Sequence, residues 1–290
     1  MESQIKSPEA IREYQSEIIL NFFRHGEKEK DKTKTDEQIR LTPGGRMQAK
    51  NKAEKGSDID QSVAFVSTKE RTWETAGFVM AGGEDEITGN ETLEELKTKI
   101  DKDLAYGSKF NVDSRLDFSI GKTEYEKQAI DAFTKGKFME FLADQSDTLA
   151  KEQGFEGQLT YSRQAKGVAE IVLKYFNIAP RWNKLVEEKS DKYEPEMKRF
   201  FATHQGIAES FLMKVVEMTK GIEERNKLIK ALKNTGFDVT EGFELDVITK
   251  AGSEKPTLHL KYSKKSDTPL NDFSIDEEID LSVVEQIAQG

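Results

Sequence analysis

SEIILNFFRHGE, residues 16–27, joins a short apolar run to a charged loop. The run from Ile18 to Phe23 has the length and the charged boundaries of a buried strand in a parallel sheet. One of only 3 histidines in the chain, His25, follows this strand beside Arg24. A buried strand that ends in such a pair holds two chemically capable side chains at the edge of a sheet.

The segments that follow alternate between helix and strand. LTPGGRMQAKNKAEKG (41–56) has a Thr-Pro start signal and a glycine stop signal, which predict a helix. SVAFVS (62–67) predicts a second buried strand, and KERTWETAGFVMAGG (69–83) predicts a second helix. This order predicts an α/β fold with a parallel sheet.

The rest of the chain departs from this alternation in two places. Residues 84–160 are acidic and helix-prone and predict a helical insertion or cap region, with one possible strand, KFNVDSRLDF (109–118), between its helical parts. RFFAT (199–203) predicts a strand that ends at His204, and residues 242–265 predict two strands around a turn. From residue 266 onward there is no Lys or Arg, so we expect residues 1–265 to form one domain, with 266–290 as an acidic, weakly ordered tail that has room for a short helix.

Composition excludes several classes of function. The net charge is −10, so the protein has no general attraction to nucleic acid or to anionic membranes. There is no cysteine, which excludes disulfides, thiolate metal sites and cysteine nucleophiles. The apolar runs are far shorter than a membrane span, and the first residues do not resemble a signal peptide. We therefore expect a cytoplasmic protein without nucleic-acid or membrane partners.

Three predicted strands end in polar residues that can bind an anion. In parallel sheets, ligands bind beyond the carboxyl ends of the strands. The three ends carry Arg24 and His25, then Ser67 with Arg71 one helical turn later, then His204 and Gln205. If the strands are neighbours, two arginines and two histidines share one crevice, and its most suitable guest is a phosphate.

Chemistry suggests a role for each of these side chains. A neutral imidazole such as His25 can attack phosphorus and split one displacement into two easier ones. Arg24 and Arg71 have planar forks that bind phosphate oxygens in bidentate fashion. His204, if protonated, adds a third positive group.

Four segments resemble the histidine phosphatase superfamily, also called phosphoglycerate mutase-like, in the order of that family. They are FRHGE, LTPGGRMQA, STKERTWETA and THQGIAESFL, and the resemblance covers residues 18 to about 215. It implies a three-layer α/β/α sandwich with a mostly parallel central sheet and a helical insertion. It also implies that His25 accepts the phosphoryl group, that Arg24, Arg71 and His204 complete the phosphate pocket together with Gln205, and that no metal or other cofactor takes part.

The general acid of the family is less well matched. One branch of the family has a carboxylic acid directly after the second histidine, where this chain has Gln205. In the other branch an acid precedes a glycine by four residues, as Asp117 precedes Gly121 in RLDFSIG. We take Asp117 as the candidate acid. The alternatives are Glu91, Asp113 and Glu124.

The resemblance implies a metal-independent phosphatase that forms a covalent phosphohistidine on His25. Its partner would be a small phosphorylated substrate, or a phosphoprotein that carries phosphohistidine. Two alternatives remain open: a pseudo-phosphatase that binds a phospholigand or partner without turnover, and a phosphomutase. We expect residues 84–160 to determine specificity. The charged segment KEKDKTK (28–34) is expected to be a solvated loop rather than a binding patch, at the border of the site where it could touch an anionic substrate.

Overall fold

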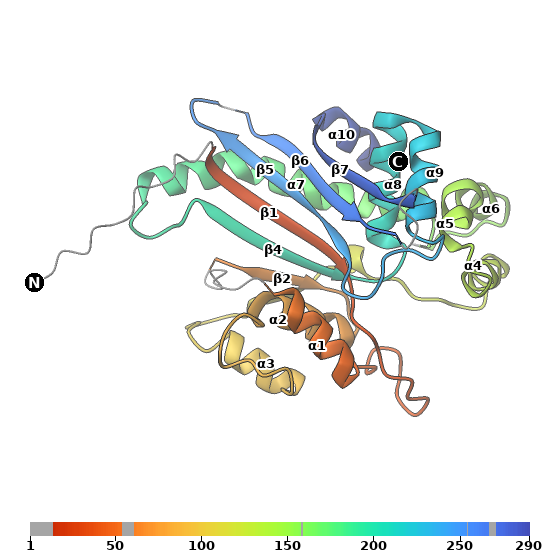
Figure 1. Ribbon diagram of the computed structural model, residues 1–290, viewed down its shortest axis with the longest axis horizontal. Coiled ribbons are helices and arrows are strands. Elements are labelled where there is room, and N and C mark those ends of the chain that lie inside the picture. The colour runs from red at the N-terminus through yellow and green to blue at the C-terminus, as the bar shows by residue number, and fades with distance from the viewer. Residues whose placement is uncertain (1–13, 54–60, 158, 254, 267–270) are drawn as a thin grey trace, which may run out of the picture.

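The computed structural model describes residues 14–53, 61–157, 159–253, 255–266 and 271–290. Seven strands form one sheet in the order β3-β2-β4-β1-β5-β6-β7 (Figure 1). The strands are β1 (Tyr14–Arg24), β2 (Val63–Val66), β3 (Phe110–Val112), β4 (Glu196–Thr203), β5 (Gly242–Lys250), β6 (Thr257–Lys264) and β7 (Phe273–Ile279).

Helices cover both faces of the sheet, which confirms the predicted α/β class. They are α1 (Pro43–Lys52), α2 (Glu70–Ala81), α3 (Leu93–Ile100), α4 (Glu124–Thr134), α5 (Phe138–Phe141), α6 (Asp147–Glu152), α7 (Tyr161–Glu188), α8 (Ile207–Lys220), α9 (Ile222–Ala231) and α10 (Leu281–Gln289). Figure 1 shows α1, α2 and α3 on one side and α7, α8 and α10 on the other, with α4, α5 and α6 beyond the carboxyl ends of the strands.

The sheet is mixed. β3, β2, β4 and β1 are parallel, whereas β5, β6 and β7 pair antiparallel. The expectation of a mostly parallel sheet therefore describes only the half that carries the three strand ends. The other half is antiparallel because short connections join β5 to β6 and β6 to β7, and a short connection reverses the chain direction.

A row of stacked phenylalanines aligns the central strands. Phe22 in β1 is paired with Phe201 in β4 and with Phe243 in β5, and Phe201 is paired with Phe65 in β2. The ring centroids of Phe22 and Phe201 are 4.5 Å apart, and those of Phe65 and Phe201 are 5.1 Å apart. Each aromatic pair contributes about 0.5–1.5 kcal/mol beyond its burial, so this row fixes the register of strands whose ends carry the site.

Residues 84–160 do not form one cap. Helix α3 packs against α2, and β3 adds an edge strand to the sheet beside β2. Only the part after β3 lies near the carboxyl ends of the strands, where α4, α5 and α6 follow one another (Figure 1). The helical character predicted for this region is confirmed, and β3 lies within the possible strand at 109–118. The division of the helices between two places in the fold could not be seen in the composition.

Residues 267–270 of the expected tail lie outside the described residues, and over residues 271–290 the expectation of weak order is wrong, although a short helix is present there as expected. Residues 273–279 form β7, which pairs with β6, and residues 281–289 form α10. Alternate residues Phe273, Ile275 and Ile279 are buried, as are Val284 and Ile287 in the helix. This apolar pattern provides a buried face, and it outweighs the lack of positive charge.

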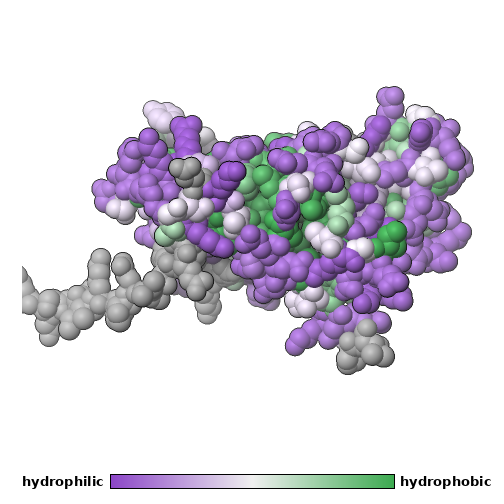
Figure 2. All heavy atoms as spheres, turned by 90° about the horizontal axis from the view of Figure 1, so that it is seen from above, coloured by the Kyte–Doolittle hydropathy of each residue, from purple (hydrophilic) through white to green (hydrophobic). Residues whose placement is uncertain are grey.

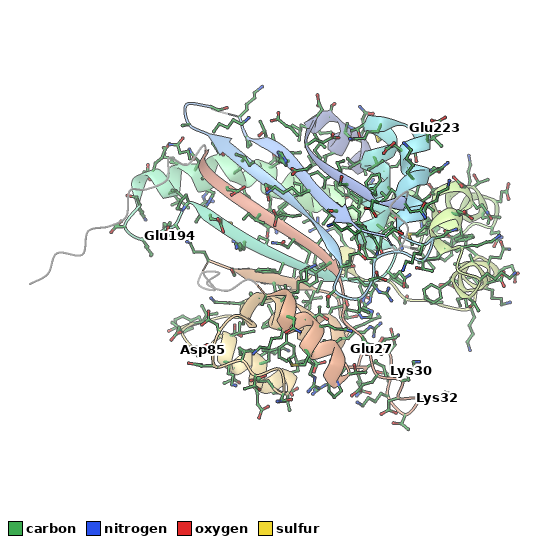
Figure 3. The ribbon with its side chains drawn as sticks, viewed as in Figure 1. Glu27, Lys30, Lys32, Asp85, Glu194 and Glu223 are labelled. Carbon is green, nitrogen blue, oxygen red and sulfur yellow. The ribbon has the colours of Figure 1, made fainter. Side chains whose placement is uncertain are left out.

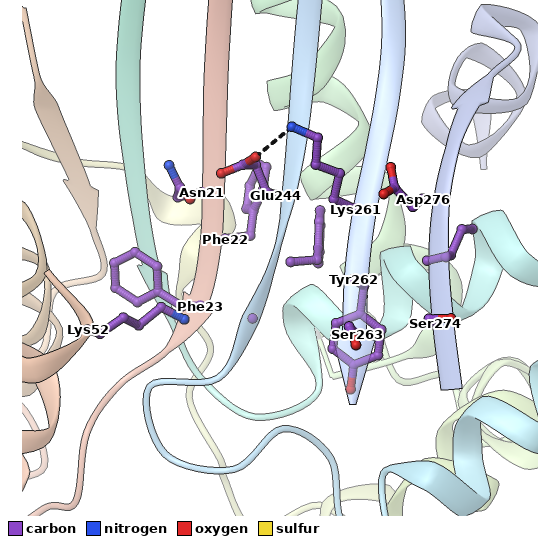
Figure 4. A pocket seen from close by; sticks show the side chains of 13 residues that line it. Asn21, Phe22, Phe23, Lys52, Glu244, Lys261, Tyr262, Ser263, Ser274 and Asp276 are labelled. Carbon is purple, nitrogen blue, oxygen red and sulfur yellow. Dashed lines mark hydrogen bonds and ion pairs between the residues drawn. The ribbon is translucent and has the colours of Figure 1, made fainter. Parts of the chain in front are cut away.

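The surface of the protein is largely hydrophilic, with a hydrophobic area near the centre of the face in Figure 2. A shallow pocket lies on β1, β5, β6 and β7, lined by Asn21, Glu244, Lys261 and Asp276 among others (Figure 4). Lys261 Nζ lies 3.0 Å from the carboxylate of Glu244. Within the part of the chain that the structure describes, no helix is long and apolar enough to cross a membrane.

Candidate active site

A cavity of about 600 Å³ lies at the carboxyl ends of β1 and β4 and beside the start of α2. Five residues predicted from the sequence line it: Arg24, His25, Arg71, His204 and Gln205. These residues come from three separate parts of the chain, and the parallel strands bring them together. We call the set formed by Arg24, His25, Arg71 and His204, with Lys69, the anion floor.

Backbone contacts hold His25 in place. The N–H of His25 donates to the Thr203 carbonyl at 2.9 Å, and the N–H of Gly26 donates to Thr75 Oγ1 at 3.0 Å. Gly45, at the start of α1, packs so closely that an added Cβ would lie 2.2 Å from the Glu27 carbonyl oxygen. The segments LTPGGRMQA and STKERTWETA therefore share one structural task, which is to fix the loop that carries His25.

The protonation of His25 suits a nucleophile. Its Nδ1 lies 2.7 Å from the Gly26 carbonyl oxygen, which can only accept, so Nδ1 carries the proton and Nε2 keeps its lone pair. Burial, followed by the charge of Arg71, lowers the pKa of His25 to about 3. The imidazole is thus neutral throughout the physiological range.

His204 stands beside His25 with its ring centroid 5.3 Å away. Its Nε2 lies 2.8 Å from Ser67 Oγ, so the end of β2 orients the imidazole at the end of β4. Burial, followed by His25 and Arg71, lowers the pKa of His204 well below its ordinary value. In the free protein His204 is therefore neutral, and it does not supply the third positive charge that the sequence analysis considered.

Both arginines are anchored but keep donors to spare. Arg24 Nη1 donates to the Phe237 carbonyl at 2.6 Å, and Arg71 Nη1 donates to the Asp36 carbonyl at 2.7 Å. The Nε atoms of Arg24 and Arg71 are buried without a hydrogen-bond partner in the described residues. Buried donors without partners are costly, and they are suited to meet an oxyanion.

Lysines supply the positive charge that His204 does not. Lys28 and Lys30 line the cavity together with Lys69, and Asp36 is bound to Arg71. Figure 3 shows Lys30 and Glu27 on the segment that follows β1. The sequence analysis missed Lys69, although it lies inside the segment STKERTWETA, and it assigned Lys28 and Lys30 to a solvated loop.

Glu209 is a second residue that sequence reasoning missed. Its carboxylate is fully buried and accepts hydrogen bonds from the N–H groups of Gly206 at 2.9 Å and Phe237 at 2.8 Å. It thereby holds the Phe237 segment whose carbonyl anchors Arg24. Because Glu209 also caps the first turn of α8, the Gly206 amide is not a free donor for an anion.

Asp117 is the candidate acid that lies nearest to the anion floor. Its Oδ1 is 2.8 Å from Lys69 Nζ and 3.6 Å from His204 Nε2, and it also accepts a hydrogen bond from Thr68 Oγ1. Burial raises the pKa of Asp117, but the hydrogen bonds from Lys69 and Thr68 outweigh burial and hold that pKa below its usual range. Asp117 is not among the residues that line the cavity.

The three alternative acids have other partners. Glu91 accepts hydrogen bonds from the N–H groups of Thr88 and Gly89 and pairs with Lys99, which ties a loop before α3. Asp113 binds Arg115 through both carboxylate oxygens, and Glu124 pairs with Lys127 on the surface of α4. Glu91, Asp113 and Glu124 do not line the cavity.

Comparisons with known structures give distant likenesses. A mycobacterial hydrolase is 15% identical, with 94% of this chain and 97% of that chain covered and a TM-score of 0.45. A mycobacterial glucosyl-3-phosphoglycerate phosphatase is 14% identical over 80% of this chain and 91% of that chain, with a TM-score of 0.40. An Entamoeba histolytica phosphoserine phosphatase is 14% identical over 83% and 94%, with a TM-score of 0.33. At these values the likenesses do not bear on substrate or mechanism.

The sequence comparison is more direct. No curated protein matches the chain. Residues 20–105 match the family model described as histidine phosphatase superfamily (branch 1), and this stretch holds Arg24, His25 and Arg71. The match supports a phosphatase-type function. Over residues 20–105 the chain is therefore similar to the histidine phosphatase superfamily.

Proposed function

We propose that the protein is a phosphatase that hydrolyses a phosphomonoester through a covalent phosphohistidine on His25. The observation that carries this proposal is a neutral imidazole, with its proton fixed on Nδ1, in a cavity lined by two arginines. Such an imidazole has a lone pair available for phosphorus without prior deprotonation. The arginines neutralise the charge that would otherwise repel it.

The reaction has two balanced steps. In the first, the His25 Nε2–phosphorus bond forms as the bond from phosphorus to the leaving-group oxygen breaks, and that oxygen takes a proton. In the second, water attacks phosphorus and the nitrogen–phosphorus bond breaks, which releases inorganic phosphate. The free Nε donors of Arg24 and Arg71, with Lys69 nearby, are suited to hold the phosphoryl oxygens in both steps.

Asp117 is the proposed proton donor for the leaving group. In the free protein Lys69 and Thr68 keep its carboxylate ionised. A bound phosphate dianion would raise the pKa of Asp117 by like-charge repulsion and would compete for Lys69. Protonation of Asp117 would thus accompany substrate binding. The acid then acts on the leaving group and the resulting carboxylate acts as the base for water.

Replacement of the nucleophile tests the proposal. We expect His25→Ala to lower the turnover of p-nitrophenyl phosphate by at least about 10⁴-fold, because the covalent step is lost. Binding of inorganic phosphate should survive, since both arginines remain. Circular dichroism of the variant controls for folding. Wild-type turnover in His25→Ala would contradict the mechanism, as would the absence of an acid-labile phosphoenzyme after rapid quenching of the wild type.

Replacement of Asp117 tests whether this residue donates a proton to the leaving group or only positions His204 and Lys69. We expect Asp117→Asn to lower kcat by about 10²-fold or more for an alkyl phosphate, whose leaving group needs a proton. The loss should be much smaller for the first step with p-nitrophenyl phosphate, because nitrophenolate leaves without one. Equal losses for both substrates would assign Asp117 to positioning His204 and Lys69 instead.

One observation favours a second candidate function. Asp117 does not line the cavity and already has two partners, so the floor could bind a phospholigand without turnover. A pseudo-phosphatase of this kind would bind phosphate and release none from a panel of phosphomonoesters. Measurable phosphate release by the wild type that depends on His25 would eliminate it.

A further inference from the structure

The cavity above the anion floor has an apolar wall. Seven residues between positions 118 and 159 line the cavity, and all of them are apolar. We call them the apolar wall; its larger members are Phe118, Ile120, Ile130, Phe133, Phe138 and Leu159. The wall contrasts with the floor, whose charged side chains lie in the same cavity. A site with one charged and one apolar side fits an amphipathic ligand.

Three large apolar side chains of the wall are exposed to solvent over about half of their surface. Ile120 is 51% exposed, Ile130 is 43% exposed and Phe133 is 49% exposed. Ile130 and Phe133 are three residues apart on α4, so they lie next to each other on one helix face. The core side of α4 is filled instead by Tyr125. Exposed apolar side chains gathered in a cavity are typical of a ligand-binding groove.

The wall begins where the leaving group would emerge. Phe118 directly follows the proposed acid Asp117, and its ring contacts His204 edge-on at a centroid distance of 5.6 Å. Ile120 follows on the same segment, and Phe133 extends the wall through Phe138, whose ring centroid is 5.7 Å away. A phosphoryl group on the floor would therefore direct its ester substituent along the wall.

This geometry disfavours a polyhydroxylated leaving group. Each hydroxyl laid against the wall would lose a hydrogen bond with water and gain none, at a cost of about tenfold in affinity. An apolar substituent gains affinity from the same surface. The cavity volume of about 600 Å³ is in the range of sites for small organic ligands.

We propose that the substrate is a small phosphomonoester with an apolar leaving group, an alkyl or aryl alcohol. Its phosphate lies on Arg24 and Arg71, and its hydrocarbon lies against Ile120, Ile130 and Phe133. This inference rests on the proposed phosphatase function for its catalytic meaning, but the preference for an apolar substituent can be measured by binding alone.

Straight-chain alkylphosphonates, which cannot be hydrolysed, test the preference. Their affinity is measured by calorimetry from methyl to octyl, with glycerol 3-phosphate as the polar comparison. We expect the affinity to rise by up to about fourfold for each methylene that is fully buried, until the wall is covered. An affinity that does not change with chain length would overturn the inference, as would tighter binding of glycerol 3-phosphate than of butylphosphonate.

Substitutions in the apolar wall test whether its side chains cause the dependence of affinity on chain length. Ile130→Ser and Phe133→Ser should each reduce the gain in affinity from methylphosphonate to octylphosphonate by at least about threefold. The matched control is Ile222→Ser: Ile222 is 59% exposed, at the start of α9, and does not line the cavity. Ile222→Ser should leave this gain in affinity unchanged. An unchanged gain in both wall variants would overturn the assignment of Ile130 and Phe133.

The outcomes separate this inference from the proposed function. Chain-length dependence without phosphate release from any ester supports the apolar site and contradicts the phosphatase. Phosphate release without chain-length dependence supports the phosphatase and contradicts the apolar site. A phosphotyrosyl peptide bound about 100-fold more tightly than phenylphosphonate would overturn the assignment of a small-molecule substrate in favour of a phosphoprotein.

Discussion

The anion floor and the apolar wall line the same cavity, but they are held in different ways. His25, Arg71 and His204 are at most 7% exposed, and each forms a hydrogen bond with another segment. Ile130 and Phe133 are nearly half exposed on helix α4, and the Phe133 ring packs against Phe138 without a hydrogen bond. A rigid floor suits a reaction with strict geometry, whereas a wall without directional contacts can accept substituents of different shape.

The largest expected effect comes from the floor. We predict that Arg71→Ala lowers kcat/KM for p-nitrophenyl phosphate by about 10³-fold, because a buried guanidinium is lost from the phosphoryl oxygens. Arg71→Lys should recover little of this loss, since a lysine cannot bind Asp36 and an oxyanion with one planar fork.

The exposed Arg181 on α7 provides the control, and Arg181→Ala should behave as the wild type. Steady-state kinetics and a thermal melt of each variant check the prediction. An Arg71→Ala variant with more than a tenth of the wild-type kcat/KM would remove Arg71 from the floor.

Two adjacent glycines test how rigidly the floor is held. An added Cβ at Gly45 would lie 2.2 Å from the Glu27 carbonyl oxygen, whereas the nearest atom at Gly44 would be 3.6 Å away. We predict that Gly45→Ala lowers the free energy of unfolding by about 1–3 kcal/mol and also lowers turnover, because the loop that carries His25 must move. Gly44→Ala should be neutral or slightly stabilising, since alanine favours a helix.

Urea denaturation and turnover of p-nitrophenyl phosphate measure both variants. If Gly45→Ala and Gly44→Ala are equally stable and equally active, the contact between α1 and the loop does not support the floor.

The buried histidines make stability depend on pH. The pKa of His25 is about 3 in the folded protein against about 6.5 in an unfolded chain. A depressed pKa contributes stability that is complete above pH 6.5 and is lost as pH falls toward 3. From pH 7 to pH 5, His25 should account for a loss of about 2 kcal/mol in the free energy of unfolding, and His204 acts in the same direction.

The comparison of wild type with His25→Gln isolates this effect, because other groups also titrate. Asp246, whose pKa burial raises to about 6, changes stability in the opposite sense in both proteins. Urea denaturation at pH 7 and pH 5 should give a smaller loss for His25→Gln. Identical losses in the two proteins would show that His25 is not held neutral by the fold.

The smallest expected effect concerns the wall. We predict that Ile130→Ser changes the free energy of unfolding by less than about 0.5 kcal/mol, since its side chain is already 43% exposed. Met139, in the neighbouring helix α5, is fully buried, and Met139→Ser should cost about 2–5 kcal/mol. A large loss of stability in Ile130→Ser would mean that Ile130 serves the fold rather than a ligand.

The tertiary structure explains which parts of the site could be predicted. Arg24 and His25 directly follow the apolar run Ile18 to Phe23, and His204 follows RFFAT; both stretches predict buried strands. Arg71 lies in a segment with a family pattern. These are local features of the sequence. Lys28 and Lys30 lie in a charged loop that looks like ordinary solvated surface. Their place in the cavity depends on how that loop folds against the rest of the protein.

By itself, the sequence determined the α/β class, the strand ends and four residues of the anion floor, Arg24, His25, Arg71 and His204, because strand burial and motif spacing are encoded over short stretches. Only the tertiary structure decided that β5 pairs antiparallel with β1, that residues 273–279 are an ordered strand, and that Ile130 and Phe133 belong to a cavity. An apolar helix face has the same pattern whether it packs against the core or lines a binding site. Which of these it does depends on the distant segments that reach it.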